Sequence, residues 1–260
     1  MKLVHVLNVR CTRPAGDRAD EESSPLPTLV LPRRGVFRYH GGARTIVADA
    51  NTVLLFHPQE PYRITHPTDG GDDCIALRFD RDAAADALGF AGETGKAWLP
   101  NAPTHRAIHR SADAVLVAED ELAREETALE LLAIVAGRKP VAPNVRDAAR
   151  IETVRERLAA GLGERVSLAA LARDAGLSPF HLARRFRSHT GTSLHQYRLA
   201  LRLGVARAML RDGADDLTGL ALDLGFATPA HFSAAFRGAH GCSPSALRNR
   251  MRERTGAAQH

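Results

Sequence analysis

Residues 178–191, SPFHLARRFRSHTG, are repeated at residues 228–241 as TPAHFSAAFRGAHG. At an offset of 50 the two stretches share five residues, namely Pro179/Pro229, His181/His231, Phe186/Phe236, Arg187/Arg237 and Gly191/Gly241. Upstream the repeat continues at an offset of 49, in the pairs Leu168/Leu217, Leu171/Leu220, Ala172/Ala221, Asp174/Asp223 and Gly176/Gly225. Two short helices joined by a turn with a glycine are typical of a helix-turn-helix, and the repeat indicates two such units.

Capping residues mark the helix ends in the first unit. We expect Ser167 to cap a helix whose inner face consists of Leu168, Leu171, Ala172 and Ala175. Gly176 suits the left-handed conformation that ends a helix, because glycine has no Cβ. Ser178 then caps the second helix, and Pro179 suits its first position. The sequence therefore predicts two helices joined by a tight turn.

The second helix of each unit is predicted to face DNA. Leu182 and Phe186 lie four residues apart and point inward, which leaves the arginines of this helix outside. Arginine can bind guanine through two hydrogen bonds, whereas the alternative is that these arginines only solvate a surface helix. The DNA-facing residues predicted in the first unit are Ser178, Phe180, His181, Ala183, Arg184, Arg187 and Ser188. Those of the second unit are Thr228, Ala230, His231, Ser233, Ala234 and Arg237.

The second unit offers fewer polar groups than the first, so we expect base reading mainly from the first. Residues 193–213 predict a long helix between the units, because their apolar residues recur at helical intervals. A helix over 194–211 is about 27 Å long, comparable with the roughly 34 Å between successive major grooves on one side of a duplex. On this helix Arg198, Arg202 and Arg207 either contact phosphates or are solvated.

Charge differs between the two parts of the chain. Of the 260 residues 44% are hydrophobic and 25% are charged, which is ordinary for a globular protein. Residues 1–140 have 17 basic and 20 acidic side chains, a net charge of −3. Residues 141–260 have 18 and 10, a net charge of +8. The positive charge accompanies the repeat, as expected where the partner is a nucleic acid.

Cysteine usage and hydropathy argue against other classes. Cys11, Cys74 and Cys242 are an odd number of widely spaced cysteines, unlike a secreted disulfide scaffold. No run of about 18 uncharged apolar residues is present, and residues 1–14 do not have the apolar core of a signal peptide. We expect a cytoplasmic protein that has no contact with a membrane.

Short β-rich runs alternate with turn signals in the first part of the chain. The predicted strands are 28–32, 35–40, 44–48, 52–56, 62–66 and 74–79, and their even spacing favours a barrel or a jelly roll. The polar segment 10–25 is expected to be a loop. Helix formers follow at 80–89, 104–123 and 125–137.

These patterns predict an α+β fold with two domains. Residues 1–139 form an N-terminal β jelly roll with helices, residues 140–144 a linker, and residues 145–255 an all-α double helix-turn-helix domain that opens with a helix at 145–160. The helix at 125–137 has an apolar face of Ala128, Leu131, Leu132 and Val135. This face either covers its own domain or makes a homodimer contact, and the sequence favours neither.

The repeated region resembles the paired helix-turn-helix domain of the AraC/XylS family of bacterial transcription regulators. The resemblance covers about residues 145–252 and rests on LAALARDAGLSPFHLARRFRSHTGTSLHQYR followed by LTGLALDLGFATPAHFSAAFRGAHGCSPSALR. It implies base-facing positions at Phe180, Ala183, Arg184, Ala230, Ser233 and Ala234. Ala234 replaces a frequent arginine, which weakens the case for base reading by the second unit. Leu247 replaces a usual tyrosine, and we expect this to change packing only.

The family also implies a sensor domain. The stretch DANTVLLFHPQEPYRI at residues 49–64 resembles part of its cupin-type ligand domain. The resemblance implies a cupin-like barrel that binds an effector, a homodimer formed by the helices after the barrel, promoter DNA as a partner, and contact with RNA polymerase.

Four residues are candidates for effector contact, namely Cys11, Cys74, His57 and His66. One interpretation is that Cys74 is a small buried hydrophobe and that the histidines cap turns. A second is that a thiol binds a metal or reacts with an electrophile. A third, the family default, is an apolar small molecule inside the barrel, lined by Val30, Phe37, Ile46, Leu54 and Ile64.

We therefore predict a sequence-specific, DNA-binding transcription regulator with an effector domain, and no enzyme activity, cofactor or assigned metal site. The alternative is a cupin-type metalloenzyme with an appended DNA-binding domain, which needs three or more clustered His or Glu ligands. The chain has no HxH pair to supply them. A third class, an architectural DNA-bending protein, predicts a barrel packed solid with side chains.

Overall fold

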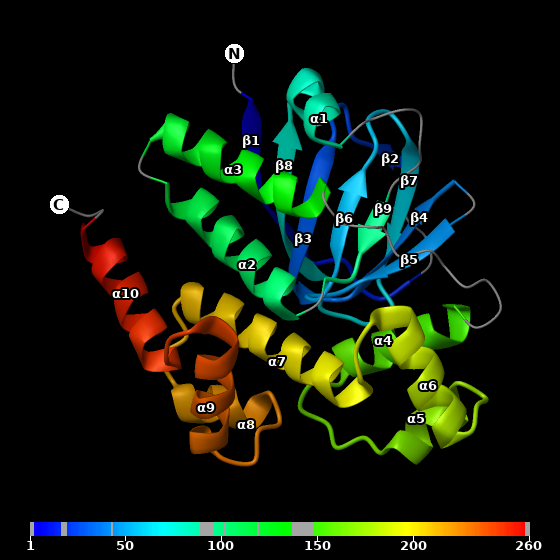
Figure 1. Ribbon diagram of the computed structural model, residues 1–260. Helices are drawn as coiled ribbons and strands as arrows, with labels where there is room; N and C mark the ends of the chain where they lie inside the picture. Colours follow the sequence, from blue (N-terminus) through cyan, green and yellow to red (C-terminus); the bar gives the residue numbers. More distant parts are fainter. Residues whose placement is uncertain are drawn as a thin grey trace.

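A computed structural model describes residues 3–16, 20–42, 44–88, 96–100, 102–118, 120–136 and 148–257. Its N-terminal part contains two antiparallel sheets (Figure 1). The five-stranded sheet has the order β1-β8-β3-β6-β9, with β1 (Val4–Cys11), β8 (Asp72–Phe79), β3 (Thr28–Gly35), β6 (Val53–Phe56) and β9 (Lys96–Trp98). The four-stranded sheet has the order β2-β7-β4-β5, with β2 (Glu22–Ser23), β7 (Pro61–Thr65), β4 (Phe37–Gly41) and β5 (Arg44–Ala48).

Apolar side chains from both sheets form one cluster, which includes Phe37 and Tyr39 of β4, Val30 of β3, Leu54 of β6 and Ala76 of β8. Alternate residues of a strand point to opposite faces, so each of these strands contributes every second side chain. The observed arrangement is the predicted β jelly roll, a sandwich with its core between the sheets.

Helix α1 (Arg81–Leu88) lies between β8 and β9 in the chain, and α2 (Ala102–Val117) and α3 (Glu121–Ala136) follow β9. Helices α2 and α3 cover the outer face of the five-stranded sheet (Figure 1). A second cluster joins Phe79 and Leu77 of β8 to Val115 of α2. It also contains the apolar face of α3, because Ala128, Leu131, Leu132 and Val135 are buried there. That face covers its own domain, and the alternative that it makes a homodimer contact is wrong.

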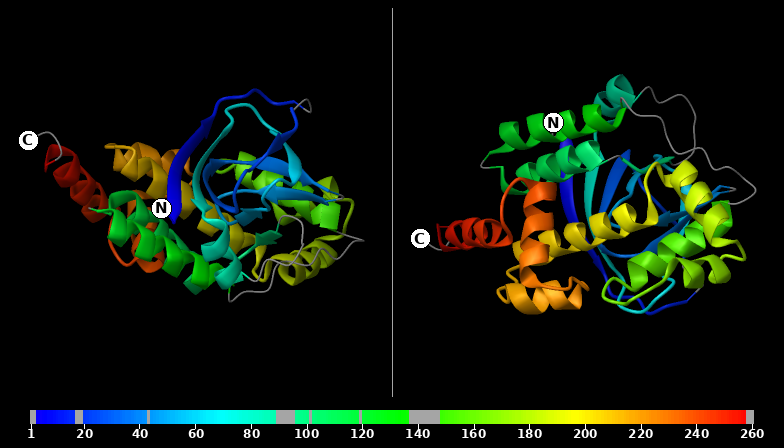
Figure 2. Two further views of the ribbon diagram at one scale, coloured as in Figure 1. Left: turned by 90° about the horizontal axis from the view of Figure 1, so that it is seen from above. Right: turned by 60° about the horizontal axis from the view of Figure 1, so that its bottom comes forward.

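The C-terminal part is entirely helical. It consists of α4 (Ala148–Ala160), α5 (Leu168–Asp174), α6 (Pro179–Thr190), α7 (Leu194–Arg211), α8 (Leu217–Asp223), α9 (Pro229–His240) and α10 (Pro244–Ala257). The pair α5–α6 lies at one end of α7 and the pair α8–α9 at the other, as Figure 1 and the right view of Figure 2 show. With 18 residues, α7 has the predicted bounds and a length of about 27 Å.

The predicted caps and turns are present in both units. Ser167 accepts a hydrogen bond from the Ala170 amide, and Ser178 accepts one from the His181 amide. Gly176 has a φ of +62°, and the Leu177 amide closes the turn by donating to the Ala172 carbonyl at 2.9 Å. In the second unit, the Phe226 amide donates to the Ala221 carbonyl at the same distance, and Gly225 has a φ of +75°. The repeat in the sequence is therefore a repeat of one backbone turn.

Several expectations need correction. Leu168 is 42% exposed and does not face the core, because it is the first residue of α5. Part of the expected loop at 10–25 is strand, since β1 extends to Cys11 and β2 covers Glu22–Ser23. The strand β9 was not predicted, and the helices expected at 104–123 and 125–137 are α2 and α3. The predicted linker at 140–144 lies outside the described residues.

Within the described ranges, no helix combines the length and the apolar character needed to cross a bilayer.

Candidate nucleic-acid interface

The outer face of α6 is open to solvent. Phe180 is 72% exposed, and Arg184 and Arg187 are also exposed, whereas Leu182 and Phe186 on the opposite face are buried. Three other predicted DNA-facing residues of this unit are exposed, namely Ser178, His181 and Ser188. The last one, Ala183, is half-buried. Among the residues that the structure describes, none covers the face that was predicted to meet DNA.

The outer face of α9 has the same layout with fewer polar groups. Phe232 and Phe236 are buried, and Arg237 is exposed. The remaining predicted residues are Thr228, Ala230, His231 and Ala234, all exposed, and Ser233, which is half-buried. Ser178 and Thr228 have a further role, because each hydroxyl caps its own helix.

Aromatic rings pack against the buried sides of α6 and α9, the two helices predicted to face DNA, which are called the reading helices below. Phe186 meets the ring of Tyr197 edge to face, with ring centroids 5.3 Å apart. In the second unit Phe232 packs between Phe226 and Phe236, at 5.1 and 5.7 Å. Leu247 is buried in the same apolar cluster, in agreement with a role in packing. The buried sides of α6 and α9 are thus fixed, and their outer sides are presented at the two ends of α7.

Three arginines of α7 make contacts within the chain. Arg198 donates to the carbonyl of Leu162 at 3.3 Å, and Arg202 donates to the same carbonyl at 2.8 Å. Arg207 is buried and forms an ion pair with Asp113 of α2. The expectation that Arg207 is solvated or contacts phosphate is wrong, because its guanidinium lies against the N-terminal part of the chain.

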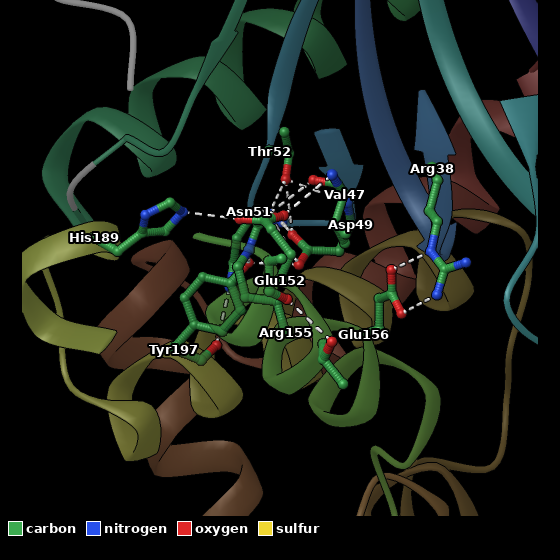
Figure 3. A network of polar contacts seen from close by, with 12 residues as sticks. Arg38, Val47, Asp49, Asn51, Thr52, Glu152, Arg155, Glu156, His189 and Tyr197 are labelled. Carbon is green, nitrogen blue, oxygen red and sulfur yellow. Dashed lines mark hydrogen bonds and ion pairs between the residues drawn. The ribbon is translucent and has the colours of Figure 1, made fainter. Parts of the chain in front are cut away.

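A buried arginine joins the two parts of the chain at α4 (Figure 3). Arg155, 2% exposed, donates to the Tyr197 hydroxyl at 2.8 Å, to Thr52 at 2.8 Å and to the backbone carbonyl of Val47 at 3.0 Å. The Tyr197 hydroxyl in turn donates to Asp49 at 2.5 Å. The turn between β5 and β6 is therefore bonded to both α4 and α7.

Glu152 adds a charged partner to this network. Its carboxylate accepts from Arg155 at 2.7 Å, from the Val47 amide at 3.1 Å and from His189 at 2.8 Å. Burial alone would raise the pKa of Glu152, but the charge of Arg155 and the hydrogen bond from His189 outweigh it and lower that pKa. Since His189 lies in the last turn of α6, the first reading helix is tied to the same network.

Further contacts extend the joint along α4 and α7. Arg38 of β4 makes two hydrogen bonds to Glu156, at 2.5 and 2.8 Å (Figure 3). At the far end of α7, Asp212 accepts a hydrogen bond of 2.6 Å from each of Arg33 and Arg34 of β3. These contacts leave no local signal in the sequence, because the partners are separated by more than 100 residues.

Of the four candidate effector residues, three lie together. Cys11 and His66 each offer a ligand atom within 4.8 Å of one from Asp72, and Cys74 donates to Asp72 with Sγ and Oδ2 3.0 Å apart. His57 is not part of this group, and its Nδ1 lies 3.2 Å from the Pro58 carbonyl oxygen. Asp72 was missed, because a single carboxylate at the start of a strand carries no signal of its own.

The apolar lining predicted for a small molecule forms one cluster, but side chains pack inside it. Val30, Phe37 and Leu54 are buried there, and Ile46 and Ile64 pack against them. Rings fill the same cluster, with the centroid of Phe56 4.9 Å from Tyr39 and 4.6 Å from Tyr62. Burial raises the pKa of Tyr62 to about 12, so its hydroxyl stays protonated at neutral pH.

Comparison with known proteins identifies the helical region. Residues 171–250 match a family model described as a helix-turn-helix domain. The chain is 37% identical over 97 residues to the HTH-type transcriptional regulator GlxA of Rhizobium meliloti, covering 37% of this chain and 30% of the relative. It is 41% identical over 85 residues to the HTH-type transcriptional activator RhaS of Escherichia fergusonii, covering 33% and 31%. Residues 171–250 therefore form a helix-turn-helix domain that is similar to part of each of these two proteins.

The matched helix-turn-helix domain coincides with the repeat. The chain spans about a third of the length of these two curated relatives, both of which are named as regulators of transcription. Among solved structures, ToxT from Vibrio cholerae is 9% identical with a TM-score of 0.39, covering 95% of this chain and 98% of that one. The DNA-binding domain of AdpA in complex with a target DNA is 30% identical with a TM-score of 0.39, covering 40% and 95%.

Proposed function

We propose that this protein is a sequence-specific, DNA-binding regulator of transcription. The observation that carries the proposal is the pair of exposed helix faces on α6 and α9, held at opposite ends of α7 within an AraC-type domain. In this proposal residues 145–255 bind promoter DNA, and residues 1–139 form an effector domain. The net charge of +8 on residues 141–260 favours a polyanionic partner.

The two reading helices are assigned different tasks. Arg184 projects from the exposed face of α6 and would read a base, because the arginine fork matches the edge of guanine. Arg237 lies near the end of α9, where arginine suits contact with the phosphate backbone. Much of the affinity would come from such backbone contacts and would fall steeply as salt is raised.

A binding experiment separates these tasks. The probe is a duplex selected by the wild-type protein from a random library, with a scrambled duplex for comparison. Arg184→Ala should weaken binding to the selected duplex by roughly 5- to 150-fold, which corresponds to about 1–3 kcal/mol, and should leave the scrambled duplex nearly unaffected. Arg237→Ala should weaken both duplexes to a similar degree and reduce the salt dependence.

The matched control is Arg63→Ala, because Arg63 is a comparably exposed arginine on β7. It should bind both duplexes like the wild type. Equal losses on both duplexes for Arg184→Ala would refute its role in base reading. No enrichment of any duplex by the wild type would refute the function itself.

The effector domain supplies the signal in this proposal, and RNA polymerase is its expected downstream partner. The N-terminal sheets contact α4 and α7 through buried polar groups, so a change in the sheets can reach both reading helices. A homodimer is also proposed, through a surface other than the buried apolar face of α3. Sedimentation of the full chain with and without the selected duplex measures the number of copies bound.

A further inference from the structure

Three potential ligand atoms meet at the margin of the β sandwich. Cys11 ends β1, His66 follows β7 of the opposite sheet, and Asp72 begins β8. Their ligand atoms all lie within 4.8 Å of one another, and His66 Nε2 is 2.6 Å from Asp72 Oδ1. His66 and Asp72 are buried, whereas Cys11 is half-buried, so the group has one side toward solvent.

The backbone brings these residues together by close packing of three strands. Cys11 pairs with Asp72 in the β1–β8 register, and Gly35 pairs with Asp72 in the β3–β8 register. A Cβ on Gly71 would lie 2.0 Å from the Cys11 carbonyl oxygen, so only glycine permits this approach. On the other side, the Gly16 amide donates to the His66 carbonyl at 3.2 Å. The pairing of β8 with β1 and β3, and not a loop alone, therefore positions the cluster.

The donor set suits a borderline d-block cation. A cysteine sulfur, an imidazole nitrogen and a carboxylate oxygen are the three ligand types of protein zinc sites, and three protein ligands leave a fourth position open. In a tetrahedral site such atoms are roughly 3.3–3.7 Å apart, so small side-chain rotations bring this cluster to that spacing.

We propose that Cys11, His66 and Asp72 bind a divalent d-block cation such as Zn²⁺, and that this cation is the effector of the regulator. On binding, the Cys11 thiol gives its proton to solvent, and the Cys11 sulfur, a ring nitrogen of His66 that carries no proton and an Asp72 oxygen form three bonds to the cation in place of the His66–Asp72 hydrogen bond. No electron is transferred. The effector role rests on the proposed function, whereas cation binding does not.

Cys74 has a positioning role in this site. Its thiol donates to Oδ2 of Asp72, while Oδ1 of the same carboxylate faces His66. Outer partners of this kind orient the ligating carboxylate.

A short path leads from the site to α7. Asp73 follows Asp72 in β8 and forms ion pairs with Arg33 at 3.6 Å and Arg34 at 3.2 Å. Both arginines also bond to Asp212, the C-cap of α7, beyond which the chain enters the second unit. A cation that shifts Asp72 would therefore act on the β8–β3 contact that holds the end of α7.

Cobalt titration of the full chain tests the site directly. Co²⁺ in place of Zn²⁺ should give a thiolate-to-cobalt absorption band that saturates at one equivalent and disappears when Zn²⁺ is added. Cys11→Ser should lose the band and weaken Zn²⁺ binding by at least tenfold, while Cys242→Ser, which removes the remote cysteine, should keep both. Cys74→Ala should keep the band and bind Zn²⁺ about tenfold more weakly.

Two results of the cobalt titration would contradict the proposed cation site. Absence of a saturable band in the wild type, or its persistence in Cys11→Ser, overturns the proposal. Thermal unfolding of Cys11→Ser and Cys242→Ser checks that both are folded, and Gly71→Ala gives an independent route, because displacement of Cys11 should also remove the band.

DNA binding tests the effector role. Zn²⁺ should change the affinity of the wild type for the selected duplex about fivefold or more, and Cys11→Ser should bind that duplex without responding to Zn²⁺. An affinity of the wild type that is the same with and without Zn²⁺ overturns the effector role. If no duplex binds under either condition, the proposed regulator function fails, and the cobalt result still decides the site.

Discussion

At the scale of single residues, Arg155 connects two distant parts of the sequence. Its guanidinium is buried and bonds to Glu152 on its own helix and to Asp49 and Thr52 in the turn before β6. Burial alone would lower the pKa of Arg155. The charges of Glu152 and Asp49 outweigh this effect and raise the pKa of Arg155. Arg155 therefore stays charged at every accessible pH.

Arg155→Met should destabilise the fold by about 3–5 kcal/mol, because it leaves the buried Asp49 and the half-buried Glu152 without the charge of Arg155. Urea unfolding measures this change. Arg150→Met is the matched control, since Arg150 lies on the exposed face of the same helix, and its effect should be within about 0.5 kcal/mol. A loss in Arg155→Met no larger than in Arg150→Met would show that the network contributes nothing to stability.

At the scale of elements, each helix-turn-helix depends on one glycine in the left-handed region. Gly176 and Gly225 have the same role and similar φ values, +62° and +75°. Their surroundings differ, because a Cβ on Gly176 meets nothing within 4 Å, whereas one on Gly225 would lie 2.9 Å from the Gly163 carbonyl oxygen. An alanine at Gly176 would therefore introduce backbone strain alone, whereas one at Gly225 would introduce backbone strain and steric overlap.

Gly176→Ala should cost roughly 1–2 kcal/mol, the strain of a left-handed alanine. Gly225→Ala should cost clearly more, because the added methyl must also displace the chain near Gly163. Chemical denaturation of the two variants gives the comparison. Equal costs would mean that the second turn relaxes freely, contrary to the packing described.

Much of these elements follows from local signals in the sequence. Caps, turn glycines and apolar spacing act within a few residues, so Ser178, Gly176 and the bounds of α7 were predicted correctly. The strand β1 was missed because it is held by its pairing to β8, more than 60 residues away. Asp72 joins Cys11 through that same register, and Arg207 finds Asp113 on a distant helix. Such partners are fixed by topology and leave no local signal.

At the scale of the whole molecule, α2, α7 and α9 meet at a junction of titratable groups. His109 of α2 lies beside His105, with which it makes a hydrogen bond of 3.0 Å, and near Arg207 of α7 and His240 of α9. Arg207 is also paired with Asp113 of α2. Burial, the neighbouring His105 and the charge of Arg207 lower the pKa of His109 well below 6.5.

This junction should make stability depend on pH. The unfolded chain binds a proton at His109 near pH 6.5, whereas the folded chain does not. The contribution of neutral His109 is therefore complete above about pH 6.5 and is lost progressively as the pH falls toward its folded pKa. The free energy of unfolding, measured from pH 7.5 to 5, should fall less steeply in His109→Gln than in the wild type. His5→Gln, at an exposed histidine, should follow the wild type.

The turn at residues 49–52 limits how the C-terminal helices of this protein can be joined to another N-terminal domain. Ala50 belongs to the apolar cluster of the C-terminal helices, 3.5 Å from the point where a Cβ on Gly204 would lie, and Asn51 donates to the Tyr197 carbonyl at 2.9 Å. A chimera that grafts these helices onto another sensor domain would therefore leave empty the site where Ala50 and Asn51 pack. It should fold soundly only if the four-residue turn is transplanted with them.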